Sequence, residues 1–400
     1  MSSTKPSTPA IDGGLPVRDT LLEFSPPVMG DEEIASVTET LRSGWLTSGP
    51  RTVELEQRFA AEVGAGHAIA TSSCTTALHL ALLAAGVGEG DEVVTTSFTW
   101  PATTNAIVHT GATPVFADVD SSTLNLDPAA LADAVGERTR AILPVHFAGG
   151  ACDMDAIQAI ARERGLAIVE DAAHAVETTA GDRRVGSIGD FTCFSLYATK
   201  SLAGGEGGVI TTDSEQAADQ LRLLRAQGIT RDPWRRQQQR MLGHYDVSLP
   251  GFKANLADLQ AAVALPKFAR LSTLYENRLR LVQQYDRGLA ELPGIEPIGR
   301  PPGGRHAHHL YVVRIDPALA GADRDRYAAA LLAENISTGL HFLPVHTLSW
   351  YRDHVAAPAL PVTEAAGATV LSLPLAGAHS EEDVADALAA LRKLHAAFTG

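Results

Sequence analysis

The stretch Phe194-Ser-Leu-Tyr-Ala-Thr-Lys-Ser-Leu-Ala-Gly-Gly-Glu-Gly-Gly-Val-Ile-Thr-Thr212 decides the fold. An apolar strand is expected to end in Lys200, and a glycine-rich turn then leads to a second apolar strand that begins near Gly208. This order places an amine at the mouth of a sheet, with room beside it for a planar group. The competing interpretation is a lysine that only extends from a strand end into solvent.

Lysine is rare in this chain, which makes Lys200 informative. The sequence has 27 arginines and five lysines, namely Lys5, Lys200, Lys253, Lys267 and Lys393. Arginine replaces lysine in most surface roles, but it does not form an imine with an aldehyde. A lysine that is kept inside an apolar segment therefore indicates a chemical role.

Apolar runs alternate with helical patterns from Val53 to about Asp213, which is typical of an α/β domain. The expected strands are His67–Thr71, Glu92–Thr96, Thr113–Asp118, Ala141–His146, Ala167–Asp171, Phe191–Tyr197 and Gly208–Thr212, and helices are expected at Thr75–Ala85, Pro101–His109 and Met154–Arg164. The almost continuous apolarity of the strands predicts a mainly parallel sheet that is covered on both faces. Ligands of such sheets bind beyond the carboxyl ends of the strands.

A second alternation in the C-terminal part predicts a smaller α+β domain. A long helix begins near Leu256 and is expected to kink at Pro266. The elements expected after it are the strand His309–Ile315, the helix Asp325–Glu334, a strand near Thr338–Phe342 and the helix Glu381–Phe398. We therefore expect a disordered or extended N-terminus over residues 1–23, a large α/β domain over residues 24–262 and a small domain over residues 263–400.

The composition excludes several classes of function. The 400 residues include 47 Asp and Glu against 32 Lys and Arg, and this net charge of −15 argues against binding to nucleic acid or to an anionic membrane surface. No apolar stretch reaches the roughly 18 residues of a transmembrane helix, and no signal peptide is expected. The three separated cysteines favour a cytoplasmic protein. His306, His308 and His309 lie at an expected strand whose side chains point to both faces, so no metal site is expected.

The run Ala167-Ile-Val-Glu-Asp171-Ala-Ala-His174 ends an apolar strand in an acid. A carboxylate there is costly without a cationic partner, and a protonated pyridine nitrogen is such a partner. His174, one turn further, could lie beside the same ring. A helix cap for Asp171 and a core position for His174 are the competing interpretations.

Two further strand ends carry polar or aromatic residues. Thr71-Ser-Ser-Cys-Thr-Thr76 opens a helix directly after a strand, and such amides and hydroxyls bind phosphate well, although an ordinary helix cap has the same residues. Ser97-Phe-Thr-Trp100 follows the next strand, where the indole could stack on a heteroaromatic ring or belong to the core. The order of these features matches the fold-type I pyridoxal-phosphate enzymes.

In its motifs the chain resembles the sugar aminotransferase family called DegT/DnrJ/EryC1/StrS. The likeness extends from about Phe24 to the C-terminus, and it rests on Gly44-Trp-Leu-Thr-Ser-Gly-Pro50, Val169-Glu-Asp-Ala-Ala-His174, Phe194-Ser-Leu-Tyr-Ala-Thr-Lys200, Gly205-Glu-Gly-Gly208, Gly251-Phe-Lys-Ala-Asn255, Asp258-Leu-Gln-Ala-Ala262 and Leu371-Ser-Leu-Pro374. The resemblance implies the fold-type I aminotransferase fold, pyridoxal 5'-phosphate as cofactor and a homodimer with shared active sites.

The resemblance also implies a role for each matching residue. It makes Lys200 the residue that forms an imine with the cofactor and moves the substrate proton, Asp171 the partner of the pyridine nitrogen, and Trp100 the residue that stacks on the ring. His174 would lie near the phenolic oxygen. The phosphate ligands would be the backbone amides of Cys74 and Thr75 with the hydroxyls of Thr75 and Ser195, and the substrate contacts would be Arg231 and His341.

The sequence departs from the family pattern at two positions. The usual glycine of the phosphate turn is Cys74, and the asparagine that reaches the partner's phosphate in many members is replaced by Lys253. We assign this contact to Lys253, since an ammonium is a natural phosphate ligand, with Asn255 as a second candidate. Arg231, in a loop that relatives place over the partner's site, could meet a diphosphate or could be part of a solvated basic loop.

The implied reaction moves an amino group from L-glutamate or glutamine to a keto-sugar on a nucleoside diphosphate. A 4-keto-6-deoxyhexose on dTDP or UDP is favoured, because the Tyr-Ala-Thr-Lys and Gly-Glu-Gly-Gly signatures are similar to those of 4-aminating members. Amination of a free keto-cyclitol and formation of an aminobenzoate remain alternatives. From another class, a regulator that binds pyridoxal phosphate without turnover also remains open.

Overall fold

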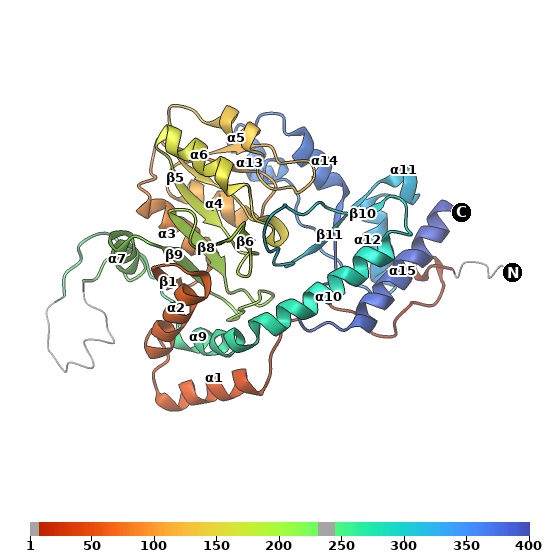
Figure 1. The fold of residues 1–400 in the computed structure, drawn as a ribbon, viewed down its shortest axis with the longest axis horizontal. Coiled ribbons are helices and arrows are strands. Elements are labelled where there is room, and N and C mark those ends of the chain that lie inside the picture. The colour runs from red at the N-terminus through yellow and green to blue at the C-terminus, as the bar shows by residue number, and fades with distance from the viewer. Residues whose placement is uncertain (1–7, 231–244) are drawn as a thin grey trace.

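A seven-stranded sheet forms the centre of the larger part of the molecule (Figure 1). The structure is a computed structural model that describes residues 8–230 and 245–400. The strand order is β1-β9-β8-β5-β4-β2-β3, where β9 is antiparallel to both β1 and β8 and the other neighbours are parallel. The strands are β1 His67–Thr71, β2 Glu92–Thr96, β3 Thr113–Ala117, β4 Thr139–Leu143, β5 Ala167–Asp171, β8 Phe191–Ser195 and β9 Gly208–Thr212. The expected mainly parallel α/β sheet is confirmed.

Helices cover both faces of this sheet, as its apolar strands require. One apolar core contains residues of α3 (Cys74–Ala84), α4 (Pro101–His109) and α7 (Glu215–Leu224). The core on the opposite face contains residues of α2 (Pro50–Val63), α5 (Pro128–Ala134), α6 (Met154–Arg164) and α9 (Asp258–Ala264). Helix α1 (Asp31–Ser43) packs on α9, and the short hairpin β6 Thr179–Ala180 and β7 Arg183–Arg184 follows β5.

The smaller part is a three-stranded antiparallel sheet packed against helices. Its strands are β10 Ile295–Pro297, β11 Tyr311–Ile315 and β12 Val370–Leu373. Its helices are α10 Leu271–Leu289, α11 Pro317–Ala320, α12 Arg324–Ala333, α14 Pro361–Thr369 and α15 Glu381–Thr399, whereas Tyr351 of α13 (Ser349–His354) packs on Phe116 of β3 and contacts α4. Figure 1 shows α10 running from the large sheet to this second core. The short 3₁₀ segments are η1 Ala10–Asp12, η2 Phe147–Gly149, η3 Leu265–Arg270 and η4 Val345–Thr347.

Three sequence expectations meet a different outcome or a refinement here. Thr338–Phe342 is not a strand, because Gly339 makes only an isolated bridge to Ser372 while Phe342 packs into an aromatic cluster; β12 is the third strand. Strand β8 ends at Ser195, not at Tyr197. The long helix begins at Asp258 and is interrupted by η3, which contains Pro266, as the expected kink predicts.

Residues 8–23 run along the smaller part as an extended segment with one short turn. The Glu334 carboxylate accepts hydrogen bonds from the backbone N–H groups of Ala10 and Val17, and Leu22 is buried beside Ile336. Within the described residues, no helix combines the length and the apolarity that crossing a membrane needs.

Candidate active site

Lys200 lies beyond the end of β8, in the turn that leads to β9. Its backbone N–H donates to the Tyr197 carbonyl at 2.9 Å, and its Nζ lies 3.1 Å from Nε2 of His309. Burial lowers the pKa of Lys200 to about 8, against the opposing effect of the nearby Asp171 carboxylate. The amine is therefore much more easily deprotonated near neutral pH than a lysine in solvent.

Asp171 ends the neighbouring strand β5 and is 7% exposed. Its Oδ2 accepts a hydrogen bond from the Thr103 hydroxyl at 2.8 Å, and its Oδ1 accepts one from the Ala173 N–H at 3.1 Å. Among the residues that the structure describes, no cation lies within ion-pair distance, and burial raises the pKa of this carboxyl. The site therefore holds a buried acid that still needs a positive partner.

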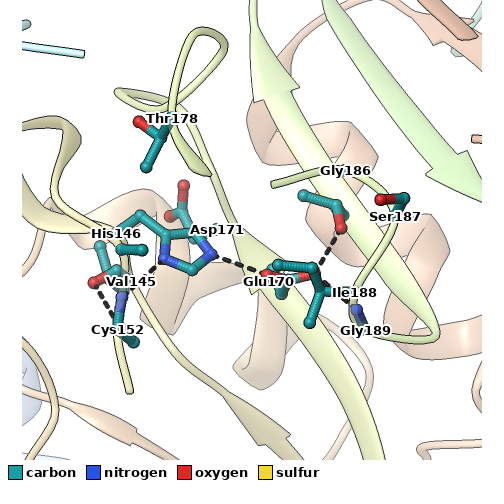
Figure 2. Close-up of polar contacts among 12 residues, drawn as sticks. Val145, His146, Cys152, Glu170, Asp171, Thr178, Gly186, Ser187, Ile188 and Gly189 are labelled. Atoms are coloured by element: carbon teal, nitrogen blue, oxygen red, sulfur yellow. Dashed lines mark hydrogen bonds and ion pairs between the residues drawn. The ribbon is translucent and has the colours of Figure 1, made fainter. Parts of the chain in front are cut away.

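A buried polar pair supports the strand that carries Asp171 (Figure 2). The Nε2 of His146 lies 2.8 Å from Oε2 of Glu170, and both side chains are fully buried. Nδ1 of His146 accepts the N–H of Cys152, so the proton that the ring donates to Glu170 is on Nε2. Burial opposes the change, but the contacts with Cys152 and Glu170 raise the pKa of His146 to about 10. Oε1 of Glu170 also accepts hydrogen bonds from Gly189 N–H and the Thr192 hydroxyl. These bonds tie β5 to both neighbouring chain segments.

The turn between β1 and α3 has the features of an anion site. Ser73 caps α3 and accepts the N–H of Thr76, whereas the structure records no acceptor within the described residues for the N–H groups of Cys74 and Thr75. Strand β9 passes so close that a Cβ on Gly208 would lie 2.5 Å from the carbonyl of Ser73. The pairing of Gly208 with Thr71 and with Ser195 brings the Ser195 hydroxyl to the same edge. The chain makes this turn with Cys74 at the position where the family pattern has a glycine.

Trp100 and His174 contribute aromatic rings to the site, and both rings lie near Phe342. Trp100 caps α4 and is 63% exposed, so it is not a core residue, and its ring lies 6.3 Å from that of Phe342. The His174 ring stacks with that of Phe342 at 6.1 Å and is tilted against that of His309 at 4.5 Å. Burial lowers the pKa of His174 well below its usual value, and the charge of Lys200 adds to this effect. His174 is therefore neutral near pH 7.

The remaining predicted residues have different outcomes. Nδ1 of His341 lies 2.9 Å from the Ser372 hydroxyl, and burial, with the charge of Lys200, lowers the pKa of His341 to about 4. Lys253 is exposed and its Nζ donates to Asn255 Oδ1; Asn255 in turn donates to Ser48 Oγ at 2.6 Å and bridges Thr71. Arg231 lies outside the described residues.

Sequence reasoning missed Thr103 and His309 as parts of the site. A threonine inside a helix gives no local signal, and in the sequence His309 stands out only as one of three neighbouring histidines. The expected strand His309–Ile315 was wrong at its start, because β11 begins at Tyr311 and the three histidines therefore lie before the strand. In the described part of the chain, no three His, Cys, Asp or Glu side chains are arranged to hold a metal ion.

These residues fit pyridoxal phosphate. The uncompensated Asp171 carboxyl suits a protonated pyridine nitrogen, and the amides of Cys74 and Thr75 suit a phosphate. The exposed indole of Trp100 suits the face of a flat ring. Lys200, with its lowered pKa, suits an aldehyde.

Comparison with known proteins points to the same chemistry. The chain is 47% identical over 380 residues to the spore coat polysaccharide biosynthesis protein SpsC of Bacillus subtilis (strain 168), a match that covers 94% of this chain and 98% of SpsC. The putative sugar aminotransferase Spr1654 from Streptococcus pneumoniae has a similar fold in its PMP form, with a TM-score of 0.88 and 31% identity over 94% of this chain and 100% of that chain. Its PLP form is similar too, with a TM-score of 0.87, 30% identity and coverage of 94% and 99%.

A third solved structure, DesI in the presence of its TDP-sugar product, has a TM-score of 0.86 and 34% identity, and the match covers 96% of this chain and 95% of DesI. The family described as the DegT/DnrJ/EryC1/StrS aminotransferase family matches residues 27–392. The chain therefore belongs to this family, whose members are pyridoxal-phosphate-dependent sugar aminotransferases.

Proposed function

We propose that this aminotransferase moves the amino group of L-glutamate, or of glutamine, to a keto-sugar linked to a nucleoside diphosphate. The favoured acceptor is a 4-keto-6-deoxyhexose on dTDP or UDP. The observation that carries the proposal is the meeting of the Lys200 amine, the buried Asp171 carboxyl and the open amides of the phosphate turn at one edge of the sheet. The likeness to SpsC and to DesI, which was solved with its TDP-sugar product, supports a nucleotide-sugar substrate.

In this proposal three groups hold the cofactor in place. The amides of Cys74 and Thr75 and the hydroxyls of Thr75 and Ser195 bind its phosphate, where the N-terminus of α3 favours negative charge. Trp100 covers one face of the ring and keeps water from it. Asp171, oriented by the Thr103 hydroxyl, keeps the proton on the ring nitrogen.

Two further side chains act on protons. Bound pyridoxal phosphate supplies an aldehyde and an electron-withdrawing ring that makes the Cα proton of the substrate acidic. The Lys200 amine takes this proton and returns it at C4' of the cofactor, a task that suits its pKa of about 8. Burial keeps His174 neutral, and its ring would lie beside the phenolic oxygen and donate a hydrogen bond to it.

The proposal extends to the substrates and to a second subunit. His341 would contact the sugar, and Arg231 would meet the diphosphate from the partner of a homodimer. Lys253, with Asn255 as the second candidate, would reach the phosphate bound in the partner's site. Such a contact needs an exposed side chain, and Lys253 is exposed. Since the three cysteines are free, we place the reaction in the cytoplasm.

The test is a direct assay of the purified protein with pyridoxal phosphate, glutamate and a set of 3- and 4-keto nucleotide sugars. We expect an amino sugar in the mass spectrum with a 4-keto-6-deoxyhexose on dTDP or UDP. Absence of product with every keto nucleotide sugar would contradict the proposal. Competition by dTDP and UDP separates a nucleotide-sugar enzyme from a cyclitol enzyme, which has no pocket for the nucleotide.

A further inference from the structure

The amine of Lys200 has a partner that no role described above uses. Nε2 of His309 lies 3.1 Å from Lys200 Nζ, across 109 positions of sequence. In residues 8–230 and 245–400 the structure records no other hydrogen bond and no ion pair for this amine. His309 is 8% exposed, so solvent does not compete freely for the contact.

The backbone holds His309 in this position. The N–H groups of His309 and Leu310 both donate to the Ala148 carbonyl, at 3.0 and 3.4 Å, and the N–H of Ala307 donates to Gly149 at 2.9 Å. His308 has a φ of 49°, in the left-handed region that residues with side chains rarely adopt. Backbone conformations of this kind persist where the surrounding structure requires them, often at functional sites.

The charges around the pair leave His309 as a neutral acceptor. The titratable and charged groups that face Lys200 or His309 are Cys74, Asp171, His174, Arg278 and His341. Burial lowers the pKa of His309 well below its ordinary value, and the charge of Lys200 adds to the effect. Near pH 7 the imidazole is therefore uncharged, and Nε2 can accept a hydrogen bond from the ammonium of Lys200.

We propose that His309 is the residue that receives and orients the Lys200 amine whenever the lysine is not joined to the cofactor. The inference rests on the proposed function, in which Lys200 leaves the cofactor and returns to it in each cycle. Nε2 accepts a hydrogen bond from the ammonium and keeps it beside the edge of the sheet. Because this bond stabilises the charged form, its removal lowers the pKa of the amine.

The experiment measures the protonation of Lys200 in the full-length, cofactor-free protein. Reductive methylation at a series of pH values, with mass mapping of the Lys200 peptide, gives the midpoint at which the amine becomes reactive. The rate at which the same protein captures pyridoxal phosphate, followed by visible absorbance, gives a second profile. The proteins compared are the parent, His309→Leu, His309→Gln, His309→Asn and the control His306→Leu.

In His309→Leu we expect both midpoints about one pH unit lower, since a hydrogen bond to a charged group has been lost. His309→Gln keeps an acceptor within reach and should return the midpoint towards that of the parent. The shorter His309→Asn should behave like His309→Leu, and it replaces that variant if a leucine prevents folding. His306→Leu removes a ring that contacts His308 and not Lys200, so this control should leave the midpoint unchanged.

The inference is overturned if the leucine and asparagine variants titrate within about 0.2 pH unit of the parent and of His306→Leu. Failure of the proposed function gives a different result. In that case the parent captures no pyridoxal phosphate, while the methylation profile still reports whether His309 holds the amine.

Discussion

Burial acts in opposite directions on the two charged groups of the site. It lowers the pKa of Lys200 to about 8 and raises that of Asp171, because both charged forms lose the solvation of water. A cofactor with a protonated ring nitrogen would give Asp171 the cation that it lacks. The aldehyde of the same cofactor would react with the Lys200 amine. Cofactor binding should therefore relieve a cost that the cofactor-free protein carries.

Replacement of Lys200 tests the covalent role. Lys200→Ala should eliminate the visible absorbance of the imine and any borohydride-reducible link to the protein, and turnover should fall more than about a thousandfold. Lys200→Arg is the matched control, because it keeps a positive charge but forms no imine. A reducible link to protein in Lys200→Ala would show that another amine carries the cofactor.

Replacement of Asp171 separates function from stability. In the cofactor-free protein, the raised pKa of Asp171 means that its contribution to stability decreases as pH rises through the range between the unfolded and the folded pKa. Asp171→Asn should therefore melt at a higher temperature than the parent at pH 7.5, with a smaller difference at pH 4. Turnover should nevertheless be lost, because an amide does not hold the ring proton. Melting curves at the two pH values and an activity assay check both parts, and near-normal turnover would contradict the proposed role.

Strand β5 presents its two acidic residues to different partners. Asp171 faces the site, whereas the buried Glu170 accepts from His146, Gly189 and Thr192. Because these bonds connect β5 with the segments beside it, they position Asp171 without contact to any substrate. The element thus combines the carboxyl that we propose to hold the cofactor with one that supports the strand.

Substitution of Glu170 should destabilise the protein strongly. Glu170→Ala leaves the buried donors of His146 and Thr192, and the half-buried Gly189 N–H, without an acceptor and should cost about 3 kcal/mol or more of unfolding free energy. Glu170→Gln should also cost more than about 1 kcal/mol, since both oxygens of Glu170 accept hydrogen bonds and the NH2 group of a glutamine would face one of these donors. Urea denaturation measures both, with the exposed Glu163→Ala on α6 as the control expected within about 0.5 kcal/mol of the parent. A parent-like Glu170→Gln would mean that His146 has the other tautomer.

At the scale of the whole molecule, the exposed face near Lys253 bears on assembly. Phe252 and Lys253 are exposed beside the segment that borders Thr71 and Ser72, and Trp100 and Tyr197 are exposed as well. The proposed homodimer would cover such side chains and bring Lys253 to the partner's phosphate. If each site contains residues of both chains, two inactive variants can complement each other in a mixed dimer.

Lys253→Ala should weaken cofactor retention by about tenfold, because a charged phosphate contact is lost. Co-expression of Lys253→Ala with the inactive Lys200→Ala should restore activity, since one site of the mixed dimer then has both lysines. Activity of the purified mixed dimer, compared with each variant alone, is the measurement. No gain over the variants alone would place Lys253 outside the partner's site.

The sequence by itself determined the architecture and the main chemical groups. Each strand of the large sheet has a local apolar pattern; Asp171 ends its strand, and the turn at Cys74, Trp100 and Lys200 follow theirs. The topology brings the carboxyl ends of the parallel strands to one edge of the sheet. Local signals were therefore enough to predict that the residues at these ends lie close together. Local signals failed at Thr338–Phe342, where an apolar run packs into an aromatic cluster instead of pairing along its length.

Only the tertiary structure decided which distant side chains complete the site. The Thr103 bond to Asp171 and the His309 contact with Lys200 join residues 68 and 109 positions apart. They depend on packing between elements and on the left-handed backbone of His308, which no periodic pattern of residue types encodes. Burial, which shifts the pKa of Lys200 and of Asp171, is likewise a property of the folded chain, because desolvation needs atoms from every element around the group.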